Sequence, residues 1–290
     1  MTAPCATGID TGFVTLGYAK VAVLGVVQGV TELLPISSTA HMRIVPALLG
    51  WRDPGSAFSA AMQLAALAAV ISYFWHDVRR LAVGSVSALG RRQFGDPDLR
   101  LVVWIGLATV PIALGGILLS NNLNTCNSPL RALPVIGWAC IAMAVLMALT
   151  EIFARHHRSV ENASLVDALL VGFAQVGALI PGVSRSGSTL TTALALGFKR
   201  EEAARFSFLL GIPAITLAGS KELWELHKAN LDIHGWSILA LGLIVASVSA
   251  FAAIWTLMRV LERFSAWPFV IYRGTLGILL LVASANAWLI

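Results

Sequence analysis

Long apolar stretches dominate the chain, and short polar connections separate them. A helix needs about 20 apolar residues, each rising about 1.5 Å, to cross the hydrocarbon core of a bilayer. The stretches that meet this requirement predict six full transmembrane spans: Ala57–Trp75, Leu101–Ser120, Leu133–Phe153, Glu202–Ser220, Trp236–Met258 and Trp267–Ala287. The pattern therefore predicts an all-α integral membrane protein.

Two further apolar stretches, Ala19–Leu34 and Leu165–Ile180, are too short to cross and are each followed by a proline. After Pro35 and Pro181 come short runs of small polar residues, and then a second short apolar stretch. A break inside the membrane leaves backbone groups unpaired, which is tolerated where the backbone is buried in protein or lines a wet cavity. We therefore predict two re-entrant helix-loop-helix segments that form a functional site.

The two re-entrant segments resemble each other at an offset of 147 positions, since Gly25 and Gln28 recur as Gly172 and Gln175. The chain is thus expected to be one membrane domain, 1–290, with repeat one over about 17–153 and repeat two over about 164–288. Each repeat would hold a re-entrant pair and three spans. An odd number of crossings places the halves in opposite orientations, which predicts an inverted repeat with its site near the interface of the halves.

Composition narrows the class of protein further. The mean hydropathy is +0.80, 57% of residues are apolar and only 12% are charged, whereas roughly a quarter of residues are charged in a soluble domain. A water-soluble enzyme, a disordered scaffold and a DNA-binding domain are excluded, because too few polar residues are present to solvate such a surface.

The net charge of +5 is spread over short connections, with no aromatic-interleaved basic stripe, so no nucleic-acid partner is expected. With the N-terminus outside, twelve Lys and Arg residues fall on the cytoplasmic side and six on the opposite side. The positive-inside bias therefore favours both termini outside. The N-terminus carries Asp10 and no basic residue ahead of the apolar run, so we expect the first membrane segment to be retained.

The three cysteines, Cys5, Cys126 and Cys140, form no CxxC pair and no ladder of spacings. Metal binding by cysteine and a disulfide framework are both poorly supported by this pattern. We assign the cysteines no role.

Glu32 and Arg185 lie at membrane depth, where a charged side chain costs at least about 2.5–3.5 kcal/mol. Their places in matching loops predict that they meet. One interpretation is a structural ion pair that joins the two loops, and the other is a functional site. The neighbouring hydroxyls and imidazole favour the second.

In the first loop, Gln28 and Glu32 share a helix face, and Ser37, Ser38 and His41 follow within nine residues. A carboxylate, two hydroxyls and an imidazole around one bend can supply an acid, a base and a nucleophile. Either serine taken alone is more typical of a helix cap. The set as a whole favours chemistry.

The second loop places hydroxyls, glycine and an arginine at the start of a helix. The residues expected to bind an anion there are Ser184, Arg185, Ser186, Gly187 and Thr189. A helix N-terminus offers free N–H groups, and an Arg fork matches two phosphate oxygens, so phosphate is the expected anion. The alternative is a polar cap packed against the other repeat.

Three polar residues have open roles. Arg273, near the start of the last span, could snorkel outward or line the cavity and bind substrate. Asp167 and Gln175 could pair with the first repeat or mark a wet entrance.

Two long segments, Gly25–His41 and Pro181–Thr189, together resemble the undecaprenyl-diphosphate phosphatase family, the bacitracin-resistance membrane phosphatases. The resemblance extends over the whole chain and includes Arg205–Pro213 and Tyr272-Arg273. It implies removal of the terminal phosphate from a polyprenyl diphosphate at the outer face of the bacterial inner membrane. That reaction recycles the lipid carrier for peptidoglycan synthesis and gives bacitracin resistance.

The resemblance also implies roles for individual residues. The acidic motif of the family falls on Gln28 and Glu32, its Ser-Ser and His on Ser37, Ser38 and His41, and its Arg motif on Ser184, Arg185, Ser186 and Thr189. Many members have Glu where this chain has Gln28, so one carboxylate that could bind Mg²⁺ or Ca²⁺ is missing. Ala40 stands where Gly is usual before the His, which removes no chemical group.

We therefore expect Arg185 and loop N–H groups to hold the diphosphate while a hydroxyl, Ser38 rather than Ser37, attacks the terminal phosphorus. His41 is expected to act as acid or base, and Glu32 to orient it or to bind a divalent cation. Positioning and neutralisation of charge are the main needs of phosphoryl transfer. Attack by water without a covalent intermediate is a second route.

The rival function is a transporter or flippase of a polyprenyl phosphate lipid, because inverted repeats with broken helices are also a transporter architecture. The nucleophile and base set in the first loop favours the enzyme, since transport alone does not require it. The expected partners are the polyprenyl diphosphate, membrane lipids and, in a homodimer, a second copy of the chain.

Overall fold

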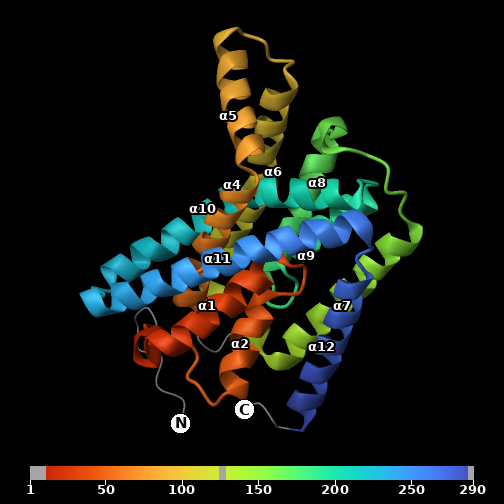
Figure 1. Cartoon of the computed structure of the whole chain (residues 1–290). Coiled ribbons are helices and arrows are strands. Elements are labelled where there is room, and N and C mark those ends of the chain that lie inside the picture. Colours follow the sequence, from red (N-terminus) through yellow and green to blue (C-terminus); the bar gives the residue numbers. More distant parts are fainter. Residues whose placement is uncertain (1–10, 124–128, 287–290) are drawn as a thin grey trace.

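The computed structural model describes residues 11–123 and 129–286, and helices account for nearly all of their regular structure (Figure 1). The helices and their bounds are η1 Gly12–Leu16, α1 Gly17–Leu33, α2 Ser38–Leu48, α3 Ser56–Ala61, α4 Gln63–Tyr73, α5 Trp75–Gly90, α6 Pro97–Leu123, η2 Pro129–Arg131, α7 Leu133–Phe153, η3 Val160–Asn162, α8 Leu165–Val176, η4 Gly177–Leu179, α9 Arg185–Ala195, α10 Arg200–Lys228, α11 Ile233–Arg263 and α12 Trp267–Ala285. No β-sheet forms within these residues. The all-α prediction is confirmed.

Six helices of the described chain are long and apolar enough to cross a membrane, and a bent pair could supply a seventh. Five of the six, α6, α7, α10, α11 and α12, contain or closely match predicted full spans. The sixth is η1 with α1, which forms a 22-residue apolar segment although the sequence predicted only a half-span there. The chain is therefore a multi-pass membrane protein.

The predicted full span Ala57–Trp75 is not one continuous helix in the structure. The structure divides it into α3 and α4, and α4 meets α5 at an angle of 79°. Phe74, at the break, is buried in the main core, and Asp77 just beyond it forms an ion pair with Arg205 of α10. The bend lets the apolar ring enter the core while the charged side chains stay together.

The sequence also predicted a cytoplasmic loop after this span, where the structure has α5. Buried Leu81, Ser85 and Ala88 recur at helical spacing, and Figure 1 shows α5 beside α6 in a hairpin that extends from the body. Polar residues on the remaining faces hid this periodicity. Val83 and Val86 of α5 are exposed, as lipid-facing side chains would be.

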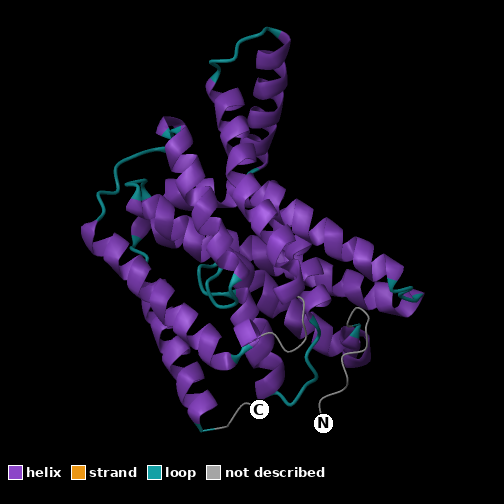
Figure 2. Cartoon of the chain, turned by 180° about the vertical axis from the view of Figure 1, so that it is seen from behind, coloured by secondary structure: helices purple, strands orange, loops and turns teal. Residues whose placement is uncertain are grey.

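Helix-loop-helix segments are present at both predicted places, as α1 with α2 and as α8 with α9. Leu34 and Ile180 precede the two prolines and have extended backbone, with ψ of 144° and 119°, which ends each first helix. Figure 2 shows the loop between η4 and α9 inside the helical body. Both breaks thus lie where protein surrounds the backbone.

Small residues allow the re-entrant helices to pack closely on long helices. Gly25 of α1 lies against the backbone of Gly242 in α11, and Gly172 of α8 lies against the backbone of Ala108 in α6. A Cβ at either glycine would clash with a carbonyl oxygen. Close approach of this kind is the usual packing mode of membrane helices.

Asp167 has a structural role at the start of α8. Its carboxylate forms a capping box with Ser164 and receives two hydrogen bonds from Arg158, of 3.0 and 2.6 Å. Hydrogen bonding to this carboxylate raises the pKa of Arg158 above its ordinary value. Arg158 also donates to the carbonyl of Leu196, so the pair fixes the connection before α8 to the end of α9 and does not reach the first repeat.

Candidate functional site

The two re-entrant loops have the same local backbone. Ser37 and Ser184 precede α2 and α9, with φ angles of 73° and 68°. The Ser37 hydroxyl accepts a hydrogen bond from the amide of Ala40, and the Ser184 hydroxyl accepts one from the amide of Gly187. These two serines are therefore N-caps, which is the role that each serine alone predicts.

The Glu32 carboxylate is the centre of the site, because three side chains donate to it. Ser38 Oγ lies 2.6 Å from Oε2, Gln28 Nε2 lies 3.0 Å from Oε2, and Arg185 Nη2 lies 3.1 Å from Oε1. The predicted meeting of Glu32 and Arg185 is confirmed. Hydrogen bonds from both repeats thus fix the carboxylate next to a hydroxyl.

The same place receives the N-termini of two half-helices. Ser38 is the first residue of α2 and Arg185 is the first residue of α9, and both bond to Glu32. Helix N-termini carry partial positive charge and unpaired N–H groups, so two of them together favour an anion. Ser38 and Arg185 are partly exposed, with 13% of the Arg185 side chain accessible, so the site can be reached.

His41 faces a different partner from the one expected. Its Nδ1 lies 2.7 Å from the carbonyl of Ser37 and its Nε2 lies 2.6 Å from the Tyr272 hydroxyl. A carbonyl can only accept, so Nδ1 carries the proton and the neutral ring accepts at Nε2 from tyrosine. Both ring nitrogens are occupied, so the ring bonds to neither Ser38 nor Glu32 in this conformation.

Hydroxyls of the second loop mostly bond to protein. Ser186 Oγ lies 3.2 Å from the carbonyl of Glu32 and 3.1 Å from that of Leu34, so it joins α9 to the first loop. Thr189 Oγ1 lies 2.8 Å from the carbonyl of Arg185 and 2.5 Å from the hydroxyl of Ser207. The two residues were expected to bind substrate, and here they hold the loops and α10 together.

Arg273 lies beneath both loops and has no exposed surface. Its Nη1 donates to the carbonyl of Pro35 at 2.9 Å, and its Nη2 donates to those of Gly182 and Val183 at 2.8 and 2.9 Å. The side chain neither snorkels outward nor presents a free guanidinium to a cavity. Pro35 and Gly182 stand 147 positions apart, so one arginine joins equivalent points of the two loops.

Two glycines shape the space around the arginines. A Cβ at Gly187 would lie 2.5 Å from Nη1 of Arg273, so the predicted close approach is to protein here. A Cβ at Gly211 of α10 would come closer still to Nη1 of Arg185, so no side chain fits at this position. Gly211 and Tyr272 lie in segments that carry the resemblance, but no local signal in the sequence predicted their contacts.

The equivalent positions of the second repeat lack this chemistry. Leu179 stands 147 positions after Glu32, and Gln175, the counterpart of Gln28, is fully buried with no hydrogen-bond partner among the described residues. Of the two loops, only the first therefore carries such a carboxylate. Cys140 is a buried free thiol that contacts the carbonyl of Gly182, and Cys5 and Cys126 lie outside the described residues.

Within residues 11–123 and 129–286, no group of three His, Cys, Asp or Glu side chains could hold a metal ion. At this site the oxygen donors are the Glu32 carboxylate, the Gln28 amide and the Ser38 hydroxyl. Mg²⁺ is often held by one or two carboxylates together with substrate phosphates and water. The donor set fits a cation that shares its ligands with a phosphate.

In this site a carboxylate, a hydroxyl and an arginine from two loops are in contact. Residues 21–279 match the family model described as "Bacitracin resistance protein BacA". The chain belongs to this family. The BacA match includes both loops, α10 and most of α12, and so every residue of the site described above.

Relatives of this BacA chain cover nearly its whole length. It is 76% identical over 262 residues to "Undecaprenyl-diphosphatase 2" of Mesorhizobium japonicum, which covers 90% of this chain and 99% of that protein. It is 47% identical over 268 residues to the undecaprenyl-diphosphatase of Synechococcus elongatus, covering 92% and 93%. Gloeobacter violaceus has an undecaprenyl-diphosphatase that is 47% identical over 266 residues, covering 92% and 91%.

Proposed function

We propose that this chain hydrolyses undecaprenyl diphosphate to undecaprenyl phosphate and inorganic phosphate. The observation that carries the proposal is the Glu32 carboxylate, which accepts hydrogen bonds from Ser38 at 2.6 Å and from Arg185 at 3.1 Å. The Glu32 carboxylate as base thereby contacts both the Ser38 hydroxyl as nucleophile and the Arg185 guanidinium, which can bind phosphate. The relatives named undecaprenyl-diphosphatase support the choice of substrate.

Substrate binding would exchange the partners of Arg185. In the structure its guanidinium is paired with Glu32, and Gly211 of α10 lies directly behind it. An entering diphosphate would accept from the Arg185 fork and from free N–H groups at the starts of α2 and α9. We therefore assign phosphate binding to Arg185 and to backbone amides.

The chemical step follows from the short contact between Ser38 and Glu32. The Ser38 proton moves to the Glu32 carboxylate while Oγ bonds to the terminal phosphorus, and the bond from that phosphorus to the bridging oxygen breaks. Undecaprenyl phosphate leaves, and water then hydrolyses the phosphoserine to release inorganic phosphate. In the second route, water attacks directly while Ser38 orients it.

The remaining residues position this centre. Tyr272 and the Ser37 carbonyl hold His41 in one tautomer. His41 lies in α2, four residues after Ser37. Ser186 and Arg273 join the loops through backbone carbonyls. We therefore propose positioning roles for Tyr272, Ser186 and Arg273, in place of the direct contacts with substrate that the sequence suggested for Ser186 and Arg273. His41 keeps its proposed role as acid or base.

A divalent cation, Mg²⁺ or Ca²⁺, fits the proposal as a partner of the substrate. Glu32 and the amide oxygen of Gln28 would hold it, with phosphate oxygens and water as the other ligands. When bound, it would neutralise phosphate charge. Because this chain has Gln28, an amide replaces what could be a second carboxylate, and we expect weak cation binding in the absence of substrate.

The proposed setting is the bacterial inner membrane, with the site open to the outer side and an inverted repeat around it. Support comes from the exchange of partners between the halves, since α1 packs on α11 while α8 packs on α6, and α7 packs on α12. The charge asymmetry of the connections supports both termini outside.

The test is release of inorganic phosphate from undecaprenyl diphosphate by purified protein in detergent, with Mg²⁺, Ca²⁺ or a chelator. We expect Ser38→Ala to lose at least about a thousandfold in kcat, because it removes the nucleophile. Thr39→Ala, which changes the neighbouring exposed hydroxyl, is the matched control and is expected to retain activity. Phosphoserine at position 38 in quenched turnover would distinguish the covalent route from water attack.

A fully active Ser38→Ala protein would remove the nucleophile assignment. Folded wild-type protein that binds the lipid and releases no phosphate under any of these conditions would favour the transporter or flippase.

A further inference from the structure

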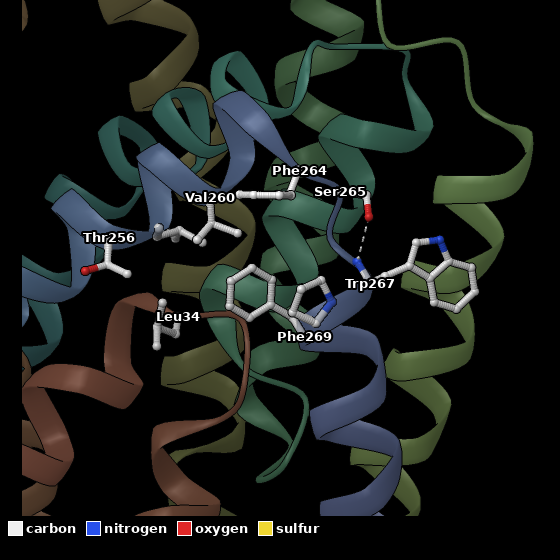
Figure 3. Close-up of a pocket in the computed structure, with 9 residues that line it drawn as sticks. Leu34, Thr256, Val260, Phe264, Ser265, Trp267 and Phe269 are labelled. Carbon is white, nitrogen blue, oxygen red and sulfur yellow. Dashed lines mark hydrogen bonds between the residues drawn. The ribbon is translucent and has the colours of Figure 1, made fainter.

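An apolar cavity of about 610 Å³ opens beside the first re-entrant loop. It is formed by the start of the first loop at Leu34, the last two turns of α11 and the start of α12. Its lining residues are Leu34, Thr256, Leu257, Val260, Phe264, Ser265, Trp267, Pro268 and Phe269. Figure 3 shows Leu34 below α11 and Phe269 across from Val260, around one shared space.

The cavity offers no free charge. Its two hydroxyl-bearing residues are occupied by backbone, since Thr256 Oγ1 donates to the carbonyl of Ala252 at 2.9 Å and Ser265 Oγ accepts from the amide of Trp267 at 3.4 Å. The other seven lining side chains are hydrocarbon or aromatic. Such a cavity stabilises an apolar ligand by removing its surface from water.

Leu34 connects the cavity with the reactive centre. Its carbonyl accepts the hydrogen bond from Ser186 at 3.1 Å, and the carbonyl of the next residue, Pro35, accepts from Arg273. Leu34 lies two residues beyond Glu32, so their Cα atoms are at most about 7 Å apart along an extended chain. A molecule whose polar end reaches Glu32 and Arg185 can therefore place an attached chain along Leu34.

We propose that this cavity binds the isoprenyl units of the substrate nearest to its diphosphate. The inference rests on the proposed function, which supplies a polar head with an apolar chain attached to it. The volume lies within the roughly 300–1,000 Å³ typical of ligand pockets. Cavity and loop share Leu34, so a chain bound there would anchor the diphosphate in register with Ser38.

A second apolar groove provides a matched comparison. It has about 290 Å³ and is lined by Ala68, Ala69, Ser72, Ser247, Val248 and Phe251. It also uses α11, but it includes no residue of either re-entrant loop. Val260 and Val248 are thus valines of one helix that line different apolar grooves.

The test compares Val260→Trp with Val248→Trp on two substrates, undecaprenyl diphosphate and methyl diphosphate, which has the reacting groups without the chain. We expect Val260→Trp to raise KM for undecaprenyl diphosphate about tenfold, because the indole displaces part of the chain. The kcat/KM of Val260→Trp for methyl diphosphate is expected to match the wild type. For Val248→Trp, KM for undecaprenyl diphosphate and kcat/KM for methyl diphosphate are both expected to match the wild type.

A second measurement observes the chain directly. A non-hydrolysable undecaprenyl diphosphate analogue with a photoreactive group on its first isoprenyl unit is expected to cross-link to peptides of 256–269. Excess of an ordinary phospholipid should not reduce this labelling. Suppression by phospholipid would show that a membrane lipid occupies the cavity instead. Labelling confined to 68–72 and 247–251 would show that the chain binds in the second groove.

Equal loss on both substrates, or no change in KM for Val260→Trp, would overturn the proposal. Failure of the proposed function gives a different result, since the wild type would then release no phosphate from either substrate.

Discussion

The backbones of Ser37 and Ser184, 147 positions apart, adopt the same left-handed conformation, and both hydroxyls cap the half-helix that follows. A residue with a Cβ is strained at positive φ. Each loop therefore stores strain just before the residue that contacts Glu32, Ser38 in one case and Arg185 in the other. The strained turn is what directs both helix starts toward one carboxylate.

This conformation predicts an unusual order of tolerance at Ser184. We expect Ser184→Gly to be more stable than Ser184→Ala, since glycine adopts positive φ freely and costs only a few tenths of a kcal/mol at an N-cap. Alanine keeps the strain and loses the cap, at a cost of about 1 kcal/mol. Thermal unfolding in detergent measures the difference. A glycine variant less stable than the alanine variant would mean that the positive φ at position 184 is not a source of strain.

A substitution at Gly211 tests how strongly phosphate binding depends on the position of the Arg185 guanidinium. In Gly211→Ala the new methyl group would displace the Arg185 guanidinium, since nothing larger than hydrogen fits there. Misplacement by about 1 Å can cost about a hundredfold in rate, so we expect kcat/KM to fall about 10- to 100-fold. Steady-state phosphate release gives the value.

The control for that variant is Gly219→Ala, two turns further along α10, where a Cβ would meet the side chain of Leu64. It tests crowding of the same helix against an apolar neighbour and should lower stability without raising KM. Similar kinetic losses in both variants would argue against a specific contact of Gly211 with Arg185.

Arg273 and Arg185 are predicted to respond differently to lysine. An ammonium cannot span the three carbonyls that the Arg273 fork reaches, and each buried carbonyl left unpaired costs about 1–3 kcal/mol. Arg273→Lys should therefore lower the unfolding temperature and the activity together. Arg185→Lys should lower activity with little change in unfolding temperature, because its side chain is partly exposed.

Differential scanning calorimetry of both variants, together with their rates of phosphate release, distinguishes the positioning role of Arg273 from the phosphate-binding role of Arg185. The proposed positioning role of Arg273 would be wrong if its lysine variant kept the wild-type unfolding temperature and lost only affinity for substrate.

Tyr272→Phe tests the orientation of His41. The ring would still stack on the imidazole, whose centroid lies 5.7 Å away, but Nε2 would lose its donor. We expect kcat to fall about tenfold, in line with a lost hydrogen bond of roughly 1.4 kcal/mol. In a His41→Ala background the same change should have no further effect. Additive losses would indicate that Tyr272 acts on the reaction by another path.

The sequence predicted those parts of the fold that local signals determine. Pro35 and Pro181 end the first half-helices, small polar runs follow them, and the places of Glu32 and Arg185 in matching loops predicted that they meet. The serine caps were also open to prediction, because Ser is a favoured N-cap.

What the sequence left open depends on packing between distant segments. Nothing local indicates that Phe74 enters the core and bends its helix, or that Tyr272 lies beside His41, 231 positions earlier. The charge of Arg273 suggested a ligand, but its partners are backbone carbonyls, which carry no mark in the sequence. Gly211 could be found only from the space that it leaves for Arg185.

Leu179 stands where Glu32 would recur, and Arg185 stands where Ser38 would recur, so the halves have similar loops with dissimilar side chains. The first half contributes the carboxylate and hydroxyl, and the second contributes the guanidinium. Neither half carries a complete reaction centre. Consider a Ser38→Ala chain and an Arg185→Ala chain, each cut between α7 and α8. The first keeps an intact second half, and the second keeps an intact first half. Turnover would return only when these two intact halves are combined.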